Sequence, residues 1–410
     1  MTSGHRVHAT RVESYLRRNC FNAPADSAGP RFGAELELIA LNAATCRPAP
    51  ILDADAPSTI AVVREVGARF GWLEQRSEKG ASRFVADSGA ALTFEPGGQI
   101  EYASAVHRSV DAVVRELTAV ESALREHATD HGISLLACGV DPVNGPERAP
   151  LQLDAERYRR MATYFARIGS AGARMMRQTA SLQLCVGGVD IAARWRLANA
   201  ITPVLVATFA NSARYACTDT RCVSYRAETW RGVDPLRTGV LEGRDPVREY
   251  ATFALGAPAF LIGADDELAV PLGELADDAV TDEALATHLS TLFPEVRPRG
   301  YLELRSLDAI DARHHAAALV MAAGLLVDDV ASRCAAEIVG NPSPTLLVCA
   351  GRIGLAEPSL ARWAEELAEI ALYGCARLGE SIVSEQLLAQ ARKSFDELIF
   401  SSRASEQRAP

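Results

Sequence analysis

Lysine is almost missing from this chain. Only Lys79 and Lys393 occur among 410 residues, and the other basic residues are arginines. A Walker-type phosphate loop requires a Gly-Lys-Ser/Thr sequence, and neither lysine lies in one. The sequence therefore excludes this loop, and any bound phosphates would have to be held by metal ions and arginines.

Two further features are also lacking. The formal net charge is −10 and no basic stripe is evident, which argues against a nucleic-acid partner. The apolar run from Ala316 to Val327 is too short to span a bilayer, so we expect a buried helix there and no membrane partner. With 48% hydrophobic and 23% charged residues, the composition is that of a globular protein with a large core.

The nine cysteines form no Cys-x-x-Cys pair. Their odd number and the absence of a signal peptide favour free thiols in a reducing, cytoplasmic setting. A local disulfide between Cys217 and Cys222 is the less favoured alternative.

The pattern of elements predicts an α+β fold. No stretch in the middle of the chain has the composition of a linker, so we expect one large domain over residues 30–400, after an irregular or partly helical segment 1–29 and before a disordered tail 401–410. Acidic residues recur within strands, and no Gly-rich nucleotide turn follows a strand, which favours an antiparallel sheet. The most strand-like segments are Arg31–Leu41, Ala90–Tyr102, Ala180–Val186 and Tyr301–Leu307.

The first strand carries two acidic residues on one face. Glu35 and Glu37 alternate with Ala34, Leu36 and Leu38, so strand geometry separates the carboxylates from the apolar side chains. Alone, such a pair is more typical of an exposed strand edge.

A second acidic pair flanks Pro96-Gly97-Gly98. If residues 90–102 form one strand, Glu95 and Glu101 share a face with Gln99 between them. The glycines allow the backbone to bend or to approach a ligand closely.

The third acidic segment places Tyr301, Glu303 and Arg305 on one strand face. Clustered carboxylates without Lys or His partners repel one another unless a cation neutralises them. We therefore predict a Mg²⁺ site formed by Glu35, Glu37, Glu95, Glu101 and Glu303.

Arginines supply the complementary charge. Arg305 would lie beside the metal and could contact a transferring phosphoryl group. The alternative is a plain Glu–Arg ion pair. The segment from Ser224 to Arg237 combines arginines with Tyr225 and Trp230, which suits an anionic small molecule or, equally, a solvated loop.

With these residues in view, the sequence resembles the plant-type glutamate–cysteine ligase family, which includes actinobacterial members that feed ergothioneine synthesis. The segment from Thr291 to Arg297 is especially specific. The matching segments follow in family order: Gly33–Glu37, Glu95–Glu101, Met175–Gln183, Phe209–Ser212, Arg226–Trp230, Arg237–Gly239, His288–Arg297 and Tyr301–Arg305.

The resemblance implies a glutamine-synthetase-like fold, in which a curved antiparallel sheet forms a funnel with helices packed outside. It implies ATP and Mg²⁺, with the five glutamates above as metal ligands and with Glu303 and Arg305 as catalytic residues. The substrate-binding positions that it implies are Thr179, Gln183, Arg226, Trp230, Arg237 and Tyr250.

The implied reaction joins the γ-carboxylate of L-glutamate to the amine of L-cysteine through a γ-glutamyl phosphate, giving γ-glutamylcysteine. The implied partners are small-molecule substrates, and the chain could be a monomer or a homodimer.

Three departures from the family pattern leave a second interpretation open. Cys185 stands where Asn is common, Leu38 where the plant proteins have Lys, and Phe253 where Tyr is expected. These changes leave the acidic residues intact but bear on the acceptor, so a ligase of the same fold that uses another amine is the alternative. A non-catalytic binding protein is disfavoured, because it has no physical reason to keep five costly clustered carboxylates.

Overall fold

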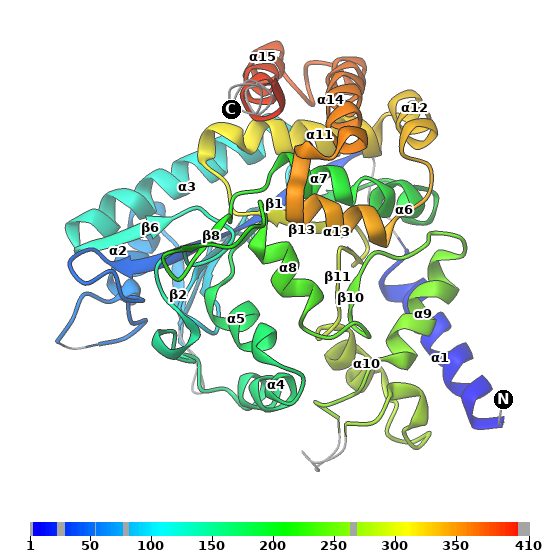
Figure 1. Ribbon diagram of the computed structural model, residues 1–410, viewed down its shortest axis with the longest axis horizontal. Coiled ribbons are helices and arrows are strands. Elements are labelled where there is room, and N and C mark those ends of the chain that lie inside the picture. Colours follow the sequence, from blue (N-terminus) through cyan, green and yellow to red (C-terminus); the bar gives the residue numbers. More distant parts are fainter. Residues whose placement is uncertain (1–2, 23–28, 54, 77–81, 263–268, 401–410) are drawn as a thin grey trace.

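A single open β-sheet organises the molecule (Figure 1). The computed structural model describes residues 3–22, 29–53, 55–76, 82–262 and 269–400. Within these ranges, nine strands form a sheet with the order β12-β13-β7-β1-β5-β4-β3-β2, and β6 pairs with the far end of β1. Every pairing in this sheet is antiparallel, which confirms the expected α+β class. The strands are β1 (Arg31–Asn42), β2 (Leu73–Gln75), β3 (Arg83–Val85), β4 (Ala91–Phe94), β5 (Ile100–Ala103), β6 (Ile133–Leu136), β7 (Ser181–Gly187), β12 (Val296–Pro298) and β13 (Leu302–Asp308).

Strand β1 lies at the centre and shows the predicted separation of faces. Ala34, Leu36 and Leu38 are buried in the main hydrophobic core. Glu35 is opposite Gln183 of β7, and Glu37 is opposite Glu101 of β5, so the polar face of the sheet collects groups from several strands.

The segment 90–102 is a hairpin, so the single strand that we expected there is wrong. Strands β4 and β5 pair with each other, and Glu95 lies in the turn between them. Gly98 has a φ of +89°, a conformation that favours glycine, and the turn closes through a hydrogen bond from Gly98 N to Glu95 O (2.8 Å). Pro-Gly-Gly therefore reverses the chain.

Helices cover the apolar face of the sheet. The layer next to the sheet includes α3, α6, α7 and α11, and α14 and α15 pack on α11 from outside (Figure 1). Helix α11 is buried along almost its whole length, as the apolar run predicted. The helices on this side are α2 (Thr59–Phe70), α3 (Val110–Asp130), α6 (Ile191–Ala200), α7 (Thr202–Thr208), α11 (His315–Val327), α12 (Asp329–Val339), α13 (Pro344–Ile353), α14 (Pro358–Leu378) and α15 (Glu385–Phe395).

The polar face lies towards a second group of helices. Helices α4 (Glu156–Ala166), α5 (Ser170–Gln178) and α8 (Tyr225–Arg231) pack together there, whereas α1 (Ser3–Asn19), α9 (Pro246–Gly256) and α10 (Asp282–Leu289) form a group at the side of the molecule (Figure 1). Two short ribbons complete the described fold: β8 (Arg214–Tyr215) with β9 (Thr218–Asp219), and β10 (Thr238–Gly239) with β11 (Phe293–Pro294). Single turns of 3₁₀ or π helix occur at Pro146–Arg148, Leu272–Glu274, Ala312–His314, Gly354–Ala356 and Asp396–Phe400.

Helix α8 was not foreseen, because residues 214–241 have little periodicity. Ser224 caps it by accepting a hydrogen bond from Ala227 N (3.1 Å). The proposed disordered tail, 401–410, lies outside the described residues. All nine cysteines are free, including Cys217 and Cys222.

Within the described ranges, no single helix is long and apolar enough to cross a membrane. One pair, Ala312–Val327 and Asp329–Val339, meets the length and composition criteria together but is bent by 98°.

Candidate functional site

A cavity of about 220 Å³ lies against the polar face of the sheet. It brings together most of the site residues that the sequence predicted, from segments far apart in the chain. Its lining residues are Glu35, Glu37, Glu95, Pro96, Gln99, Glu101, Arg157, Tyr158, Met161, Met175, Met176, Thr179, Gln183, Trp230, Ser290, Phe293, Arg297 and Arg305.

Hydrogen bonds hold the carboxylates of the sheet in place. Glu37 accepts from Ser181 N (2.8 Å) and from Gln183 Nε2 (3.1 Å). Glu101 accepts from Thr93 Oγ1 (2.9 Å). The Oε1 atom of Gln183 in turn accepts from Arg305 Nη1 (2.5 Å), so a polar chain crosses from β1 to β13.

The turn that carries Glu95 is anchored to the end of α5. The buried Gln99 donates from Nε2 to Thr179 O (2.9 Å) and accepts from Gly97 N (3.0 Å). A Cβ atom at Gly97 would lie 2.1 Å from Arg177 O, so no larger residue fits without displacing the turn. The sequence argument that glycine allows a close approach therefore holds here, but the approach is to the protein backbone.

Four carboxylates in this cavity resist ionisation. Burial is the largest cause, and it raises the pKa of Glu35 to about 7, with further contributions from the charges of Glu303 and Glu101. Burial also raises the pKa values of Glu37, Glu95 and Glu101, and the charge of Glu37 adds to the effect at Glu95 and Glu101.

Glu303 behaves differently, because arginines surround it. It is fully buried and accepts hydrogen bonds from both Nε and Nη2 of Arg297, the second at 2.8 Å. Burial alone would raise its pKa, but the charges of Arg297 and Arg305 outweigh burial and lower the pKa to about 2. Arg305 Nη1 lies 3.6 Å from Glu303 Oε2, so the alternative Glu–Arg ion pair is present, although it is buried rather than on the surface.

The carboxylates converge on the cavity without forming a closed set of metal ligands. Within the described ranges, no three His, Cys, Asp or Glu side chains are arranged to hold one ion together. Their oxygen atoms are nevertheless the ligands that hard cations prefer, and their raised pKa values show that positive charge nearby would be favourable. The donor set therefore matches a hard cation in chemical type, but its members do not converge on one ion in this structure.

Helix α8 presents unused donors beside this cavity. Arg226 is buried and donates from Nη2 to Arg305 O (2.9 Å), but it forms no ion pair with a described carboxylate, and its Nε has no partner there. The buried indole N–H of Trp230 also has no partner among the described residues. Buried donors without acceptors are costly, so both groups are suited to an anionic ligand.

Thr179 and Gln183 lie at the cavity as expected. Thr179 donates its hydroxyl to Met175 O (2.7 Å), which leaves the oxygen available as an acceptor.

Arg237 lies apart from the described cavity lining. It is fully buried, and its guanidinium donates to Asp234 Oδ2 (2.8 Å), Thr291 O (3.0 Å) and Pro258 O (2.6 Å). Aromatic rings flank it, with centroids 4.9 Å (Tyr164) and 4.7 Å (Phe260) from Cζ. In this conformation the Arg237 side chain joins three loops and does not line the cavity that holds the glutamates.

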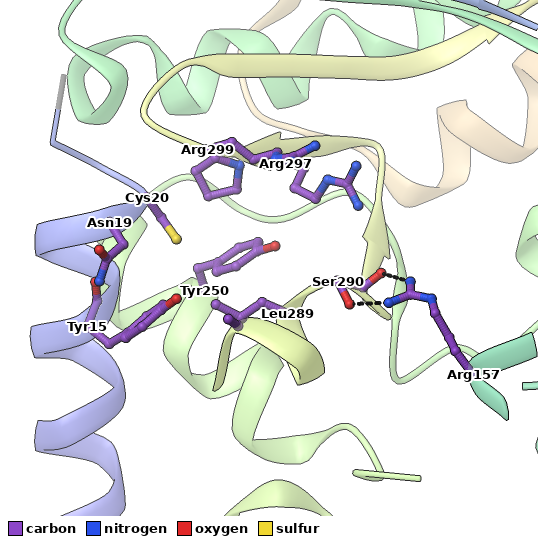
Figure 2. Close-up of a pocket in the computed structure, with 11 residues that line it drawn as sticks. Tyr15, Asn19, Cys20, Arg157, Tyr250, Leu289, Ser290, Arg297 and Arg299 are labelled. Atoms are coloured by element: carbon purple, nitrogen blue, oxygen red, sulfur yellow. Dashed lines mark hydrogen bonds between the residues drawn. The ribbon is translucent and has the colours of Figure 1, made fainter. Parts of the chain in front are cut away.

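Tyr250 lines a second cavity, of about 420 Å³, that adjoins the first (Figure 2). The two cavities share Arg157, Ser290 and Arg297. Figure 2 shows the Cys20 thiol pointing towards the Tyr250 ring.

Sequence reasoning missed Arg157, which stands between the two cavities. It donates to Ser290 Oγ (2.7 Å) and Ser290 O (3.0 Å) and, among the described residues, pairs with no carboxylate. Burial lowers the pKa of its guanidinium. On the sequence it is one of several arginines on a helix, and only the approach of Ser290 from a distant segment sets it apart.

The N-terminal segment also contributes unexpectedly. Tyr15, Asn19 and Cys20 line the second cavity, and Cys20 O accepts a hydrogen bond from Gly300 N (2.8 Å) in the turn between β12 and β13. A polar, irregular segment gave no signal for this contact.

Comparison with known proteins agrees with this geometry. Residues 31–359 match the model of glutamate–cysteine ligase family 2. The chain is 35% identical to the glutamate–cysteine ligase EgtA of Mycolicibacterium smegmatis over 291 residues, which cover 66% of this chain and 68% of that protein. It is 25% identical to the chloroplastic glutamate–cysteine ligase of Nicotiana tabacum over 330 residues, 76% of this chain and 62% of that one.

A solved structure supports the fold. The glutamate–cysteine ligase of Francisella tularensis in complex with AMP superimposes with a TM-score of 0.51 at 11% identity, covering 92% of this chain and 84% of that one. The expected glutamine-synthetase-like fold is thereby confirmed. The extent of the family match, together with the EgtA relative, shows that this chain belongs to glutamate–cysteine ligase family 2.

Proposed function

We propose that this protein is an ATP- and Mg²⁺-dependent glutamate–cysteine ligase, which joins the γ-carboxylate of L-glutamate to the amine of L-cysteine. The observation that carries the proposal is the convergence of Glu35, Glu37, Glu95 and Glu101 on one cavity, where burial and mutual repulsion raise their pKa values. Membership of the family and the names of its relatives support this reading.

The metal would be held by these four carboxylates and by Glu303. Bound Mg²⁺ supplies positive charge that offsets the repulsion among carboxylates and phosphates. Glu303 would first have to exchange its hydrogen bonds with Arg297 for the cation, and Arg297 would then be free to pair with another anion.

Glutamate would bind between α5 and α8. The buried Nε of Arg226 and the indole N–H of Trp230 lack acceptors among the described residues, and a carboxylate would supply them. Thr179 and Gln183 border the same space. Arg305, held by Gln183, would contact the phosphoryl group during its transfer from ATP to the γ-carboxylate and stabilise the negative charge on that group.

The acceptor amine would approach from the second cavity. Arg157 and Tyr250 line it, and Arg157 offers a desolvated positive charge at the boundary with the first cavity. The carboxylate of an amino acid suits such a cation, and its amine would then face the activated glutamate.

The alternative acceptor keeps the same chemistry. Cys185, where the family commonly has Asn, pairs with Glu303 in the sheet register, so the departure lies close to the site. An amine other than cysteine is therefore the second candidate.

The wider setting completes the proposal. Residues 30–400 would act as one catalytic domain, as a monomer or homodimer, on small-molecule substrates. The product would serve ergothioneine or another low-molecular-weight thiol, in the reducing cytoplasm that nine free cysteines suit.

The test is a product analysis. The protein, ATP, Mg²⁺, glutamate and cysteine should yield γ-glutamylcysteine, identified by mass, together with one phosphate for each product. A panel of other amines should give less product. Glutamate-dependent phosphate release that ignores cysteine and responds to another amine would favour the alternative acceptor, whereas no glutamate-dependent phosphate release would refute both.

A further inference from the structure

A buried carboxylate just outside the described cavities connects two parts of the site. Asp308 ends β13, the strand that carries Glu303 and Arg305, and is only 1% exposed. It lines neither cavity described above. Within the described residues, it forms no ion pair with an arginine, lysine or histidine.

Among the described residues, the hydrogen bonds to the Asp308 side chain come from the two segments that meet at the start of α8. Its Oδ2 accepts from Asn211 N (2.7 Å) and from Ser212 Oγ (2.7 Å), and its Oδ1 accepts from Ser224 Oγ (2.9 Å). A carboxylate is acceptor-only, so it can serve three converging donors at once.

The two serines connect Asp308 to α8, because their hydroxyls also accept hydrogen bonds from backbone N–H groups at the start of this helix. Ser224 Oγ accepts from Ala227 N (3.1 Å) as the helix cap, and Ser212 Oγ accepts from Arg226 N (3.1 Å). Each hydroxyl donates its single proton to Asp308 and uses one of its two lone pairs to accept from a backbone N–H.

Gly139 packs closely against one side of the Asp308 carboxylate. A Cβ atom at Gly139 would lie 2.3 Å from Asp308 Cγ and 2.6 Å from Oδ1. The neighbouring backbone therefore presses directly against the carboxylate and holds it towards the serines.

We propose that Asp308 is a positioning residue that fixes Arg226 and Trp230, on α8, relative to Glu303 and Arg305, on β13. The proposal rests on the proposed function for its catalytic consequence, since Arg226 and Trp230 are the groups assigned to glutamate. Asp308 itself touches no substrate.

The proposed role requires that both oxygens of the Asp308 side chain accept hydrogen bonds, and not only that the side chain has this size. In an Asp308→Asn variant, the shape is kept, but an amide NH₂ replaces one acceptor oxygen and faces a hydroxyl or N–H donor. The first turn of helix α8 should then become more mobile. The carboxylates on β1 and β5 (Glu35, Glu37 and Glu101) should keep their positions.

The experiment measures steady-state kinetics and amide hydrogen exchange on the full chain. The variants are Asp308→Asn, the milder Ser212→Ala, and Gly139→Ala, which displaces the carboxylate without removing its charge. The matched control is Asp328→Asn, because Asp328 is also buried and caps a helix, α12, by accepting from Ala331 N.

We expect Asp308→Asn to raise the KM for glutamate about tenfold or more and to change the KM for ATP less than about twofold, because only α8 is displaced. Exchange of the amides at the start of α8 should accelerate without substrates, and the control should change neither quantity. Gly139→Ala should reproduce the pattern, and Ser212→Ala should show it more weakly.

The hydrogen-exchange measurement distinguishes the positioning role of Asp308 from the proposed ligase activity. Unchanged exchange in α8 of both Asp308→Asn and Ser212→Ala would overturn the positioning role, as would equal increases in the KM values of all substrates. If α8 loosens but the parent protein forms no γ-glutamyl product, the proposed function fails while the anchoring of α8 by Asp308 stands. Should Asp308→Asn not fold, Ser212→Ala decides by the same two readouts.

Discussion

Replacing Glu35 by Gln should make the metal-free protein more stable at neutral and alkaline pH. Burial, together with the charges of Glu303 and Glu101, raises the pKa of Glu35 from 4.5 to about 7. The folded state therefore keeps a proton that the unfolded state has released, and stability falls as the pH rises from about 4.5 to about 7. Above about pH 7, Glu35 is ionised in the folded state too, and the unfavourable free energy of burying this charge reduces stability by its full amount.

The structure sets an upper limit to the effect. The gap between 4.5 and about 7 corresponds to about 3 kcal/mol. For a chain of 410 residues, this free energy shifts Tm by about 4 °C. The amide removes the charge and keeps the side-chain volume, so most of this difference should be recovered in Glu35→Gln.

The assay is thermal unfolding in EDTA between pH 4.5 and pH 8, for the parent, Glu35→Gln and a control. Glu337→Gln is the control, because Glu337 is exposed on α12 and should shift Tm negligibly. Glu35→Gln should melt about 4 °C above the parent at pH 8, with the difference shrinking towards pH 4.5. Added Mg²⁺ should stabilise the parent more than the variant. A variant less stable than the parent at pH 8, or a difference independent of pH, would refute the reasoning.

Three other substitutions probe separate parts of the site. Arg226→Lys should raise the KM for glutamate by about 10- to 100-fold, because lysine cannot reproduce the planar fork, and initial rates at varied glutamate check this; an unchanged KM would argue against a carboxylate contact. Arg297→Gln should destabilise the protein by about 1.5–3 kcal/mol, since Glu303 loses the hydrogen bonds from Arg297 and keeps only longer ion pairs such as that with Arg305 (3.6 Å), and urea unfolding measures the loss; equal midpoints for parent and variant would contradict it. Gly97→Ala should cost about 1–3 kcal/mol and reduce activity, because the new methyl group would overlap the backbone of Arg177, and calorimetry with an activity assay tests both; full activity at unchanged Tm would rule out the tight contact.

Local sequence patterns were informative where one strand face or one cap decides the structure. The alternation around Glu35 predicted both the strand and its polar face. Ser109, a residue type that favours helix N-caps, caps α3 by accepting from Ala112 N (3.3 Å). Pro203 disfavours a helix interior, and the structure places it in the first turn of α7, which is separate from α6.

Features that depend on contacts between distant segments could not be predicted from local sequence patterns. The Pro-Gly-Gly turn was read as part of one strand, although its turn chemistry would have supported a hairpin. Glu303 was foreseen as an acidic site residue, but its pairing with Arg297 depends on the register of β12 and β13. The role of Arg157 depends on Ser290, which lies 133 residues away.

The central claim is that this site activates the γ-carboxylate of glutamate with phosphate from ATP. The most direct measurement uses glutamate labelled with ¹⁸O in the γ-carboxylate, together with ATP, Mg²⁺ and cysteine, and determines the mass of the released phosphate. The account predicts one labelled oxygen in each phosphate and one retained in the amide of the product. Unlabelled phosphate, with both labelled oxygens still on glutamate, would contradict it.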